Sequence, residues 1–173
     1  AYDGTIRVWD LDAMSQLGGP LRGHYGWAHC VAFGLLGGRP IALSAGWDWT
    51  VRVWELGAVG VGRNLLSDPV GGFSCVSVGD IDGRAVAVTG SRSIGLQVWD
   101  LETLSELRHS SGVEARSVEC VMTHHLVGVP VAVAGSEHDG FRVWNLRSMT
   151  PIGAGFAGKA WIDKVRDLLA GRR

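Results

Sequence analysis

The sequence has little net charge and no long apolar run, and each absence disfavours a class of partner. The formal net charge is −1 over 173 residues, so we do not expect the basic surface that nucleic acid or an acidic membrane would require. No apolar stretch approaches the roughly 20 residues that span a bilayer, and no signal peptide opens the chain. We therefore expect a cytoplasmic protein with neither a nucleic-acid partner nor a membrane partner.

The common motifs of catalysis and metal binding are also missing. The sequence contains no GxxxxGK followed by Ser or Thr, no HExxH, no GxSxG and no CxxC. The adjacent His124 and His125 would point to opposite faces of a strand. His138 and Asp139 could suggest acid–base chemistry, but no nucleophile with a matching partner is visible elsewhere. We expect no catalytic residue, no bound metal and no cofactor.

What the sequence does have is a pentapeptide that occurs four times at one spacing. Its tryptophan recurs every 45 residues without slippage. Such a spacing indicates tandem copies of one structural unit, and about 40–45 residues is the size of a four-stranded propeller blade. The copies are RVWDL at 7–11, RVWEL at 52–56, QVWDL at 97–101 and RVWNL at 142–146.

The cysteines follow the same period. Cys30, Cys75 and Cys120 are one position of the repeat seen three times, each before a valine in a predicted strand. An unpaired cysteine in a strand usually behaves as a small buried hydrophobe, and we expect that role here. A ring of thiols that binds a metal is the alternative, which the absence of metal-ligand spacings disfavours.

Each full copy is expected to contain three strands joined by hairpins and a weaker fourth strand. Short apolar and alternating runs are separated by turns that contain glycine, and Gly38, Gly83 and Gly128 hold one phase of the first hairpin. The tail at 158–173 fits either the first strand of a further copy or a terminal helix, because its apolar residues also share one helical face. We favour the helix.

One copy carries a set of polar residues that resembles the WD40 repeat, in particular bacterial-type arrays with a 45-residue period. His24 follows a glycine before the first strand, Ser44 lies on the second strand, Asp48 in the next turn, and Trp54 on the third strand. In that family these side chains form a hydrogen-bonded tetrad, so the resemblance implies a structural role for all four. Glu55 replaces the family's Asp, and the polar set is degenerate in the later copies.

The resemblance covers most of the chain and implies an all-β fold. It implies a partial or open β-propeller with three full four-stranded blades plus partial blades at both ends. In the family the tryptophan strand is the third of its blade, which divides 1–173 as a single propeller segment. The divisions are a partial blade at 1–23, blades at 24–68, 69–113 and 114–157, and a partial strand or terminal helix at 158–173.

The resemblance also implies where a partner binds. In the family, the residue before the turn Asp tends to face the surface on which partners dock, and large aromatics surround this turn in the first full copy. Aromatic residues with arginine are typical interface anchors. The alternative is that these rings only cover the end of a blade. The partner-binding candidates are Tyr2, Tyr25, Trp27, Trp47, Trp49, Arg92 and Glu137.

Three hypotheses of function follow. The first is a non-catalytic protein–protein interaction scaffold or sensor module, a segment of a larger signalling or regulatory protein, that binds another protein or peptide. The second is a propeller enzyme or metal-binding propeller that uses His and Asp residues at the channel mouth. The third is a truncated repeat array that self-associates through open terminal blades.

Overall fold

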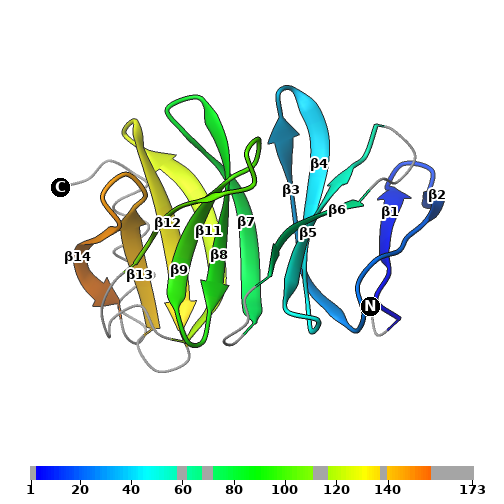
Figure 1. Cartoon of the computed structure of the whole chain (residues 1–173). Coiled ribbons are helices and arrows are strands. Elements are labelled where there is room, and N and C mark those ends of the chain that lie inside the picture. Colours follow the sequence, from blue (N-terminus) through cyan, green and yellow to red (C-terminus); the bar gives the residue numbers. More distant parts are fainter. Residues whose placement is uncertain (1–2, 58–61, 68–71, 111–116, 137–139, 157–173) are drawn as a thin grey trace.

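The chain is all-β in the residues that the computed structural model describes, which are 3–57, 62–67, 72–110, 117–136 and 140–156 (Figure 1). All strand pairs are antiparallel, and no helix occurs among these residues. The prediction of an all-β chain is confirmed. The same residues accordingly contain no helix that could cross a membrane. The tail at 158–173, where we favoured a helix, lies outside the described residues.

Each sheet consists of strands that follow one another in the chain. The first sheet has two strands and the next three have four each, and the tryptophan strand is third in every four-stranded sheet. Figure 1 shows the sheets side by side in chain order. The strands are β1 (Ile6–Asp10) and β2 (Ser15–Leu21); β3 (Ala28–Leu36), β4 (Arg39–Gly46), β5 (Thr50–Glu55) and β6 (Gly62–Ser67); β7 (Phe73–Ile81), β8 (Arg84–Ser91), β9 (Gly95–Asp100) and β10 (Glu106–His109); β11 (Val118–Leu126), β12 (Val129–Ser136), β13 (Gly140–Asn145) and β14 (Thr150–Phe156).

In three of the four copies, the Asp or Asn after the repeat tryptophan bonds the backbone of the turn into the next strand. Asp100 Oδ1 accepts hydrogen bonds from the backbone N–H groups of Glu102 and Thr103, both at 2.8 Å. Asp10 and Asn145 accept the equivalent pair of bonds in their own copies. A short carboxylate or amide side chain can satisfy the backbone donors of such a turn. This local bonding explains why Asp or Asn recurs at this position.

Strands β3 and β7 are the first strands of their sheets, and we call such strands inner strands. They approach each other closely because one face of β3 carries small residues. Cys30 and Ala32 pack with Val76 of β7 in one apolar cluster. Gly34 lies against Val78, and a Cβ added at Gly34 would be only 2.3 Å from Val78 Cγ1. A glycine inside a strand often marks such a close approach of neighbouring segments. We call such a close contact between the inner strands of two neighbouring sheets a joint. The joint between the first two four-stranded sheets therefore requires glycine at position 34.

The joint between β7 and β11 repeats this arrangement with polar partners. Gly79, one period after Gly34, lies against Thr123, and an added Cβ would be 3.1 Å from Thr123 Cβ. The Oγ atoms of Ser77 and Thr123 are 2.9 Å apart, and Thr123 Oγ1 also donates to the carbonyl of Val78 at 2.5 Å. Gly79 and the hydroxyl pair of Ser77 and Thr123 thus hold the second and third four-stranded sheets together.

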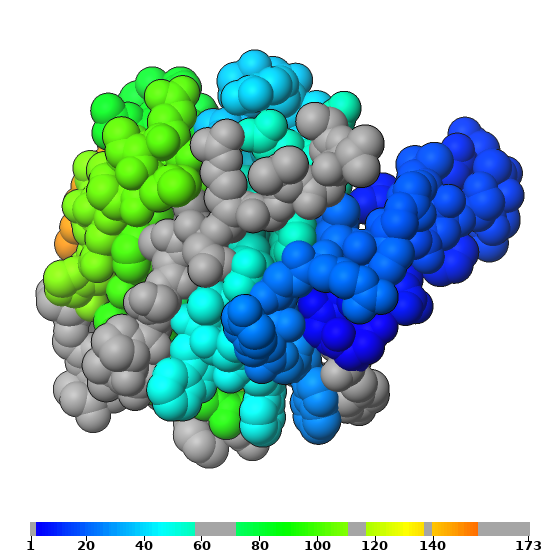
Figure 2. All heavy atoms as spheres, turned by 45° about the vertical axis from the view of Figure 1, so that its right-hand side comes forward, coloured from blue at the N-terminus to red at the C-terminus, as the bar shows by residue number. Residues whose placement is uncertain are grey.

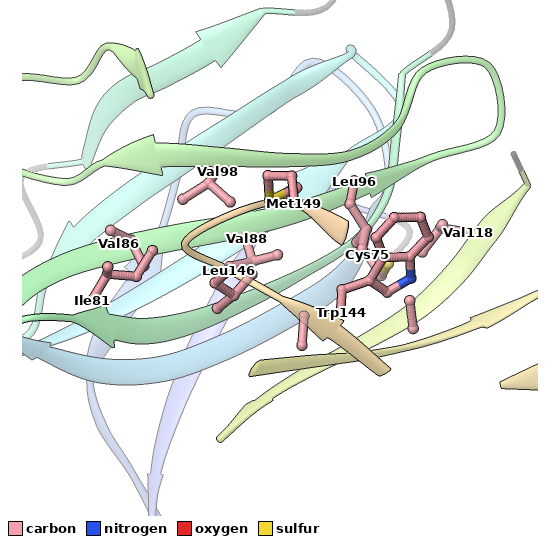
Figure 3. Close-up of a cluster of buried hydrophobic side chains, with 12 residues drawn as sticks. Cys75, Ile81, Val86, Val88, Leu96, Val98, Val118, Trp144, Leu146 and Met149 are labelled. Carbon is pink, nitrogen blue, oxygen red and sulfur yellow. The ribbon is translucent and has the colours of Figure 1, made fainter. Parts of the chain in front are cut away.

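The largest buried apolar cluster lies between these two sheets (Figure 3). Trp144 of β13 lies beside Cys75 of β7, and Leu146 in the following turn lies beside Val88 of β8. Trp144 and Leu146 are both almost fully buried. The third copy therefore uses its tryptophan mainly to fill the space between sheets.

Of the three cysteines predicted to be buried, Cys75 is buried, Cys30 is half-buried, and Cys120 contradicts the prediction. Cys30 and Cys75 pack between sheets, whereas Cys120 is exposed. Cys120 differs because it lies on the face of β11 that is turned away from β7. Burial, with the neighbouring Cys30 thiol, raises the pKa of Cys75 to about 12, so this thiol is unreactive at neutral pH.

The close joint at Gly34 gives a first testable prediction. Gly34→Ala should lower the free energy of unfolding by about 1–3 kcal/mol, the usual cost of overpacking a core, because Val78 has to move. Gly19→Ala in β2 is the matched control, since nothing lies within 4 Å of its added Cβ. Urea denaturation followed by tryptophan fluorescence measures both variants. Equal stability of the two variants would contradict a tight joint at Gly34.

Candidate functional site

The structure brings His24, Ser44, Asp48 and Trp54 into one chain of hydrogen bonds. Trp54 Nε1–H donates to Ser44 Oγ at 2.8 Å, and Ser44 Oγ lies 2.7 Å from His24 Nε2. The other ring nitrogen, His24 Nδ1, lies 2.9 and 3.1 Å from the two Asp48 carboxylate oxygens. This geometry is the tetrad that the WD40 resemblance implies, and it joins strands β4 and β5 to the segment before β3.

The bonding around Asp48 assigns the protons within this chain. Asp48 also accepts from the backbone N–H of Tyr25 at 2.9 Å and from Thr50 Oγ1 at 2.8 Å. Because the carboxylate can only accept, His24 Nδ1–H donates to it, and His24 Nε2 is left to accept from Ser44 Oγ–H. The ring is therefore neutral, and every polar atom of the chain has a partner.

The pKa values of the two ionisable members agree with this assignment. Burial lowers the pKa of His24, and the adjacent Asp48 raises it, but the net result is a pKa below the usual value. Burial raises the pKa of Asp48, yet the hydrogen bonds from Tyr25, His24 and Thr50 outweigh it, and the net result is a lowered pKa. A neutral imidazole therefore lies beside a carboxylate at neutral pH.

The tetrad is enclosed, which suits a structural role better than a catalytic one. The side chains of His24 and Asp48 are almost fully buried. A Cβ added at Gly46 would lie 2.4 Å from His24 Nδ1, so that side of the ring is filled. A general base has to reach its substrate within hydrogen-bond distance, and this ring has no access to one.

The later copies keep only parts of this network. In the second copy, Trp99 Nε1 donates to Thr89 Oγ1 at 3.0 Å. His109 lies on β10, where it is exposed and bonds Glu106 at 2.9 Å, so it does not complete a tetrad there. In the third copy, Ala134 stands at the position of Ser44. Among the described residues, the full tetrad therefore occurs only around Trp54.

The turn that contains Asp48 presents aromatic rings to solvent at one end of the molecule. Trp47 is 67% exposed and Trp49 is 54% exposed. The rings of Trp27 and Trp47 are in contact, with centroids 5.3 Å apart and planes tilted by 43°. Tyr25, whose backbone bonds Asp48, is exposed as well. Four aromatic side chains therefore surround the tetrad turn.

The rings of Trp47 and Trp49 border a surface cleft of about 500 Å³ between neighbouring sheets. One wall is the tetrad turn, and another includes an ion pair between Arg92 Nη2 and Glu119 Oε1 at 3.0 Å. We call this feature the aromatic cleft. It is lined by His29, Gly46, Trp47, Trp49, Gly72, Phe73, Ser74, Arg92 and Glu119.

The aromatic cleft brings together several of the partner-binding candidates. Trp47, Trp49 and Arg92 line it, and Trp27 and Tyr25 lie beside it through the contacts just described. Tyr2 and Glu137 lie outside the described residues.

Sequence reasoning missed the lining residues from other strands. His29, Ser74 and Glu119 among them occupy a single phase of the repeat, so the period contains a signal that could have found them together.

Trp49 holds an unfavourable backbone conformation on the wall of the cleft. Its φ is 61°, in the left-handed region, whereas the same phase of the first copy holds Gly4 with a φ of 68°. A residue with a Cβ costs roughly 1–2 kcal/mol there, and glycine does not. The ring lies over Gly72, where an added Cβ would be 2.8 Å from Trp49 Cδ1. The fold thus keeps a large aromatic at a position that suits glycine.

The polar side chains of the cleft are held by the protein itself. His29 Nε2–H donates to the carbonyl of Phe73 at 2.8 Å. The single Ser74 Oγ–H lies within hydrogen-bond reach of two carbonyls, that of Gly90 at 3.0 Å and that of Val118. Within the described ranges, no three His, Cys, Asp or Glu residues are grouped so that they could hold a metal ion. The arrangement offers an aromatic binding surface with a polar rim.

Comparison with protein-family models and with curated protein sequences finds no match to this chain.

The tetrad gives a second testable prediction. Ser44→Ala should leave the Trp54 indole N–H and His24 Nε2 without their partners, at a cost of about 1–3 kcal/mol for each buried unpaired group. Thr89→Val is the matched control, because it keeps the side-chain shape and removes one bond to the half-buried Trp99. Chemical denaturation should show a clearly larger loss for Ser44→Ala, and equal losses would contradict the coupled network.

The lowered pKa of His24 gives a third prediction, for the pH dependence of stability. In the unfolded chain His24 takes up a proton near its ordinary pKa of 6.5, whereas the folded chain resists protonation. The unfolded state therefore binds more protons below about pH 6.5, and the free energy of unfolding should fall as the pH is lowered from 7 to 5. Asp48, whose pKa is also lowered, adds its own loss only at more acidic pH.

His24→Gln should reduce this dependence, because glutamine does not titrate. The other histidines remain in both proteins and cancel in the comparison. The measurement is the free energy of unfolding at several pH values for both proteins. An unchanged slope between pH 7 and 5 would show that His24 is not the titrating group.

Proposed function

We propose that this chain is a non-catalytic protein-interaction module whose aromatic cleft binds a segment of another protein. The observation that carries the proposal is the pair of exposed tryptophans, Trp47 and Trp49, on the cleft wall. Trp49 also has a left-handed φ of 61°, as do six other non-glycine residues among those described. A glycine would relieve the strain but would remove the ring from the cleft.

The physical character of the cleft supports a protein or peptide as its ligand. Tryptophan and tyrosine offer large rigid surfaces that lose little conformational entropy on binding. The contact between Trp27 and Trp47 and the packing of Trp49 over Gly72 fix the rings in advance. The Arg92–Glu119 ion pair adds polar groups at the edge, where an interface gains specificity rather than affinity.

The order of the sheets supports an open β-propeller as the framework. The sheets follow one another along the chain, the tryptophan strand is third in each four-stranded sheet, and β7 packs with both β3 and β11. On this framework the cleft lies at one end of the blades, where turns vary without disturbing the strands. We take the module to be a scaffold or sensor segment on these grounds.

The enzyme hypothesis has less support. His29 and Ser74 are the cleft residues closest in type to a base and a nucleophile. His29 bonds the carbonyl of Phe73 and Ser74 bonds that of Val118, and each of these bonds links neighbouring sheets. Glu119 is paired with Arg92. These bonds suit side chains that hold sheets together.

A peptide-selection experiment tests the proposal and is the fourth prediction. A phage-displayed random peptide library is selected on the wild-type chain, and binding of the enriched peptides is then compared on two variants. Trp49→Gly should abolish binding while keeping the stability of the wild type within about 1 kcal/mol, because glycine relieves the strain at φ 61°. Denaturation in urea checks the stability.

Trp9→Ala is the matched control, because Trp9 is 55% exposed and lies on β1 outside the cleft. The enriched peptides should bind this variant as they bind the wild type. Selection that yields no peptide dependent on Trp49, or peptides that depend on Trp9 instead, would overturn the cleft as the binding site.

A further inference from the structure

One face of the inner strand β3 is apolar and exposed. Val31, Phe33 and Leu35 are 60%, 67% and 56% exposed. They alternate along the strand and therefore point to the same face, the one turned away from β7. We call this row the β3 face. A continuous row of three exposed apolar side chains on a sheet is typical of a surface that another element covers.

The small β1–β2 sheet lies on the same side but packs elsewhere. Ile6 of β1 and Leu21 of β2 pack with Ala28 and Trp54. The side chains of the β3 face do not belong to that cluster. Figure 2 shows β1 and β2 projecting from the side of the molecule. The described part of the first copy thus covers Ala28 and Trp54 and leaves the β3 face exposed.

The repeat shows what normally covers this row. One period later, Val76 and Val78 of β7 hold the phases of Val31 and Phe33, and they pack against the small residues of β3. Two periods later, Thr123 of β11 holds the phase of Phe33 and packs against Gly79. In both joints a glycine of the preceding inner strand lies against the residue at the Phe33 phase. The β3 face therefore carries the large side chains of a third joint, which would pack against small side chains on another element.

A second copy of this chain does not supply the strand with small side chains that would pack on the β3 face in this geometry. The corresponding row at the other end of the molecule lies on β11, where His124 holds the phase of Gly34 and Gly79. A single added Cβ at Gly34 already comes within 2.3 Å of Val78 Cγ1. An imidazole at this phase would overlap Phe33 of the neighbouring copy. Head-to-tail stacking in the geometry of the internal joints is excluded on steric grounds.

We propose that the β3 face is a docking surface for a β-hairpin on a partner protein, whose first strand carries small side chains at two alternate positions and glycine at the next. The internal joints define this chemistry, with Cys30, Ala32 and Gly34 in one and Cys75, Ser77 and Gly79 in the other. The partner's glycine lies against Phe33, and its two small residues admit the backbone close to β3. The site is separate from the aromatic cleft and does not depend on it.

A hairpin peptide from this chain tests the proposal, and this is the fifth prediction. The probe is a fluorescently labelled peptide with the sequence of residues 72–91, which spans β7 and β8. Under reducing conditions it should bind the wild-type chain saturably in a fluorescence anisotropy titration. The matched control peptide carries Gly79→Val, which keeps the tendency to form a strand and blocks the close approach, so it should bind at least tenfold more weakly.

Variants of the chain complete the test. Phe33→Glu should weaken binding of the 72–91 peptide at least tenfold, and because Phe33 is exposed the variant should unfold at the same urea concentration as the wild type. Trp49→Gly should bind the peptide normally, which separates this site from the cleft. Equal binding of the two peptides, or no saturable binding, would overturn the proposal. A dimer in sedimentation that Phe33→Glu abolishes would overturn it in favour of a second copy as the occupant.

Discussion

The close approach of the inner strands is the constraint on which the rest of the structure depends. At Gly34 and Gly79 one strand comes so near the next that even a methyl group has to displace its neighbour. This spacing brings Cys75, Val88 and Trp144 into one apolar cluster. The hydrogen-bonded tetrad acts at shorter range, because it aligns the strands of a single sheet. Glycine therefore sets the distance between sheets, and side-chain bonds set the register within one of them.

The turn at Trp49 differs from the joints in its use of glycine. Where the sheets need glycine the chain has it, whereas position 49 has a left-handed φ that suits glycine and carries tryptophan instead. The same turn holds Asp48, whose hydrogen bonds with His24, Tyr25 and Thr50 fix the backbone around the strained residue. The tetrad thus supplies the rigidity against which the strain is held. Structural and binding residues are neighbours in sequence because one supports the other.

Much of this architecture is predictable from the 45-residue period, and the remainder depends on contacts that the period does not encode. The strands follow local sequence patterns, whereas the tetrad around Trp54 is predictable only through the resemblance to the WD40 repeat. The lining of the cleft by Phe73 requires two sheets to meet, which no local pattern specifies. The exposure of Cys120 has the same origin, because equivalent cysteines differ only in what lies next to their sheet.

The uneven distribution of the tetrad has a consequence for how the copies tolerate sequence change. Hydrogen bonds are directional, so the copy around Trp54 accepts few substitutions at His24, Ser44 or Asp48. Apolar packing is not directional, and the copy around Trp144 is held by it, with Ala134 in place of the serine. Side chains of similar volume can replace one another in such a core. The first full copy is thus the one that tolerates polar substitutions least, whereas the third tolerates apolar exchanges of similar volume.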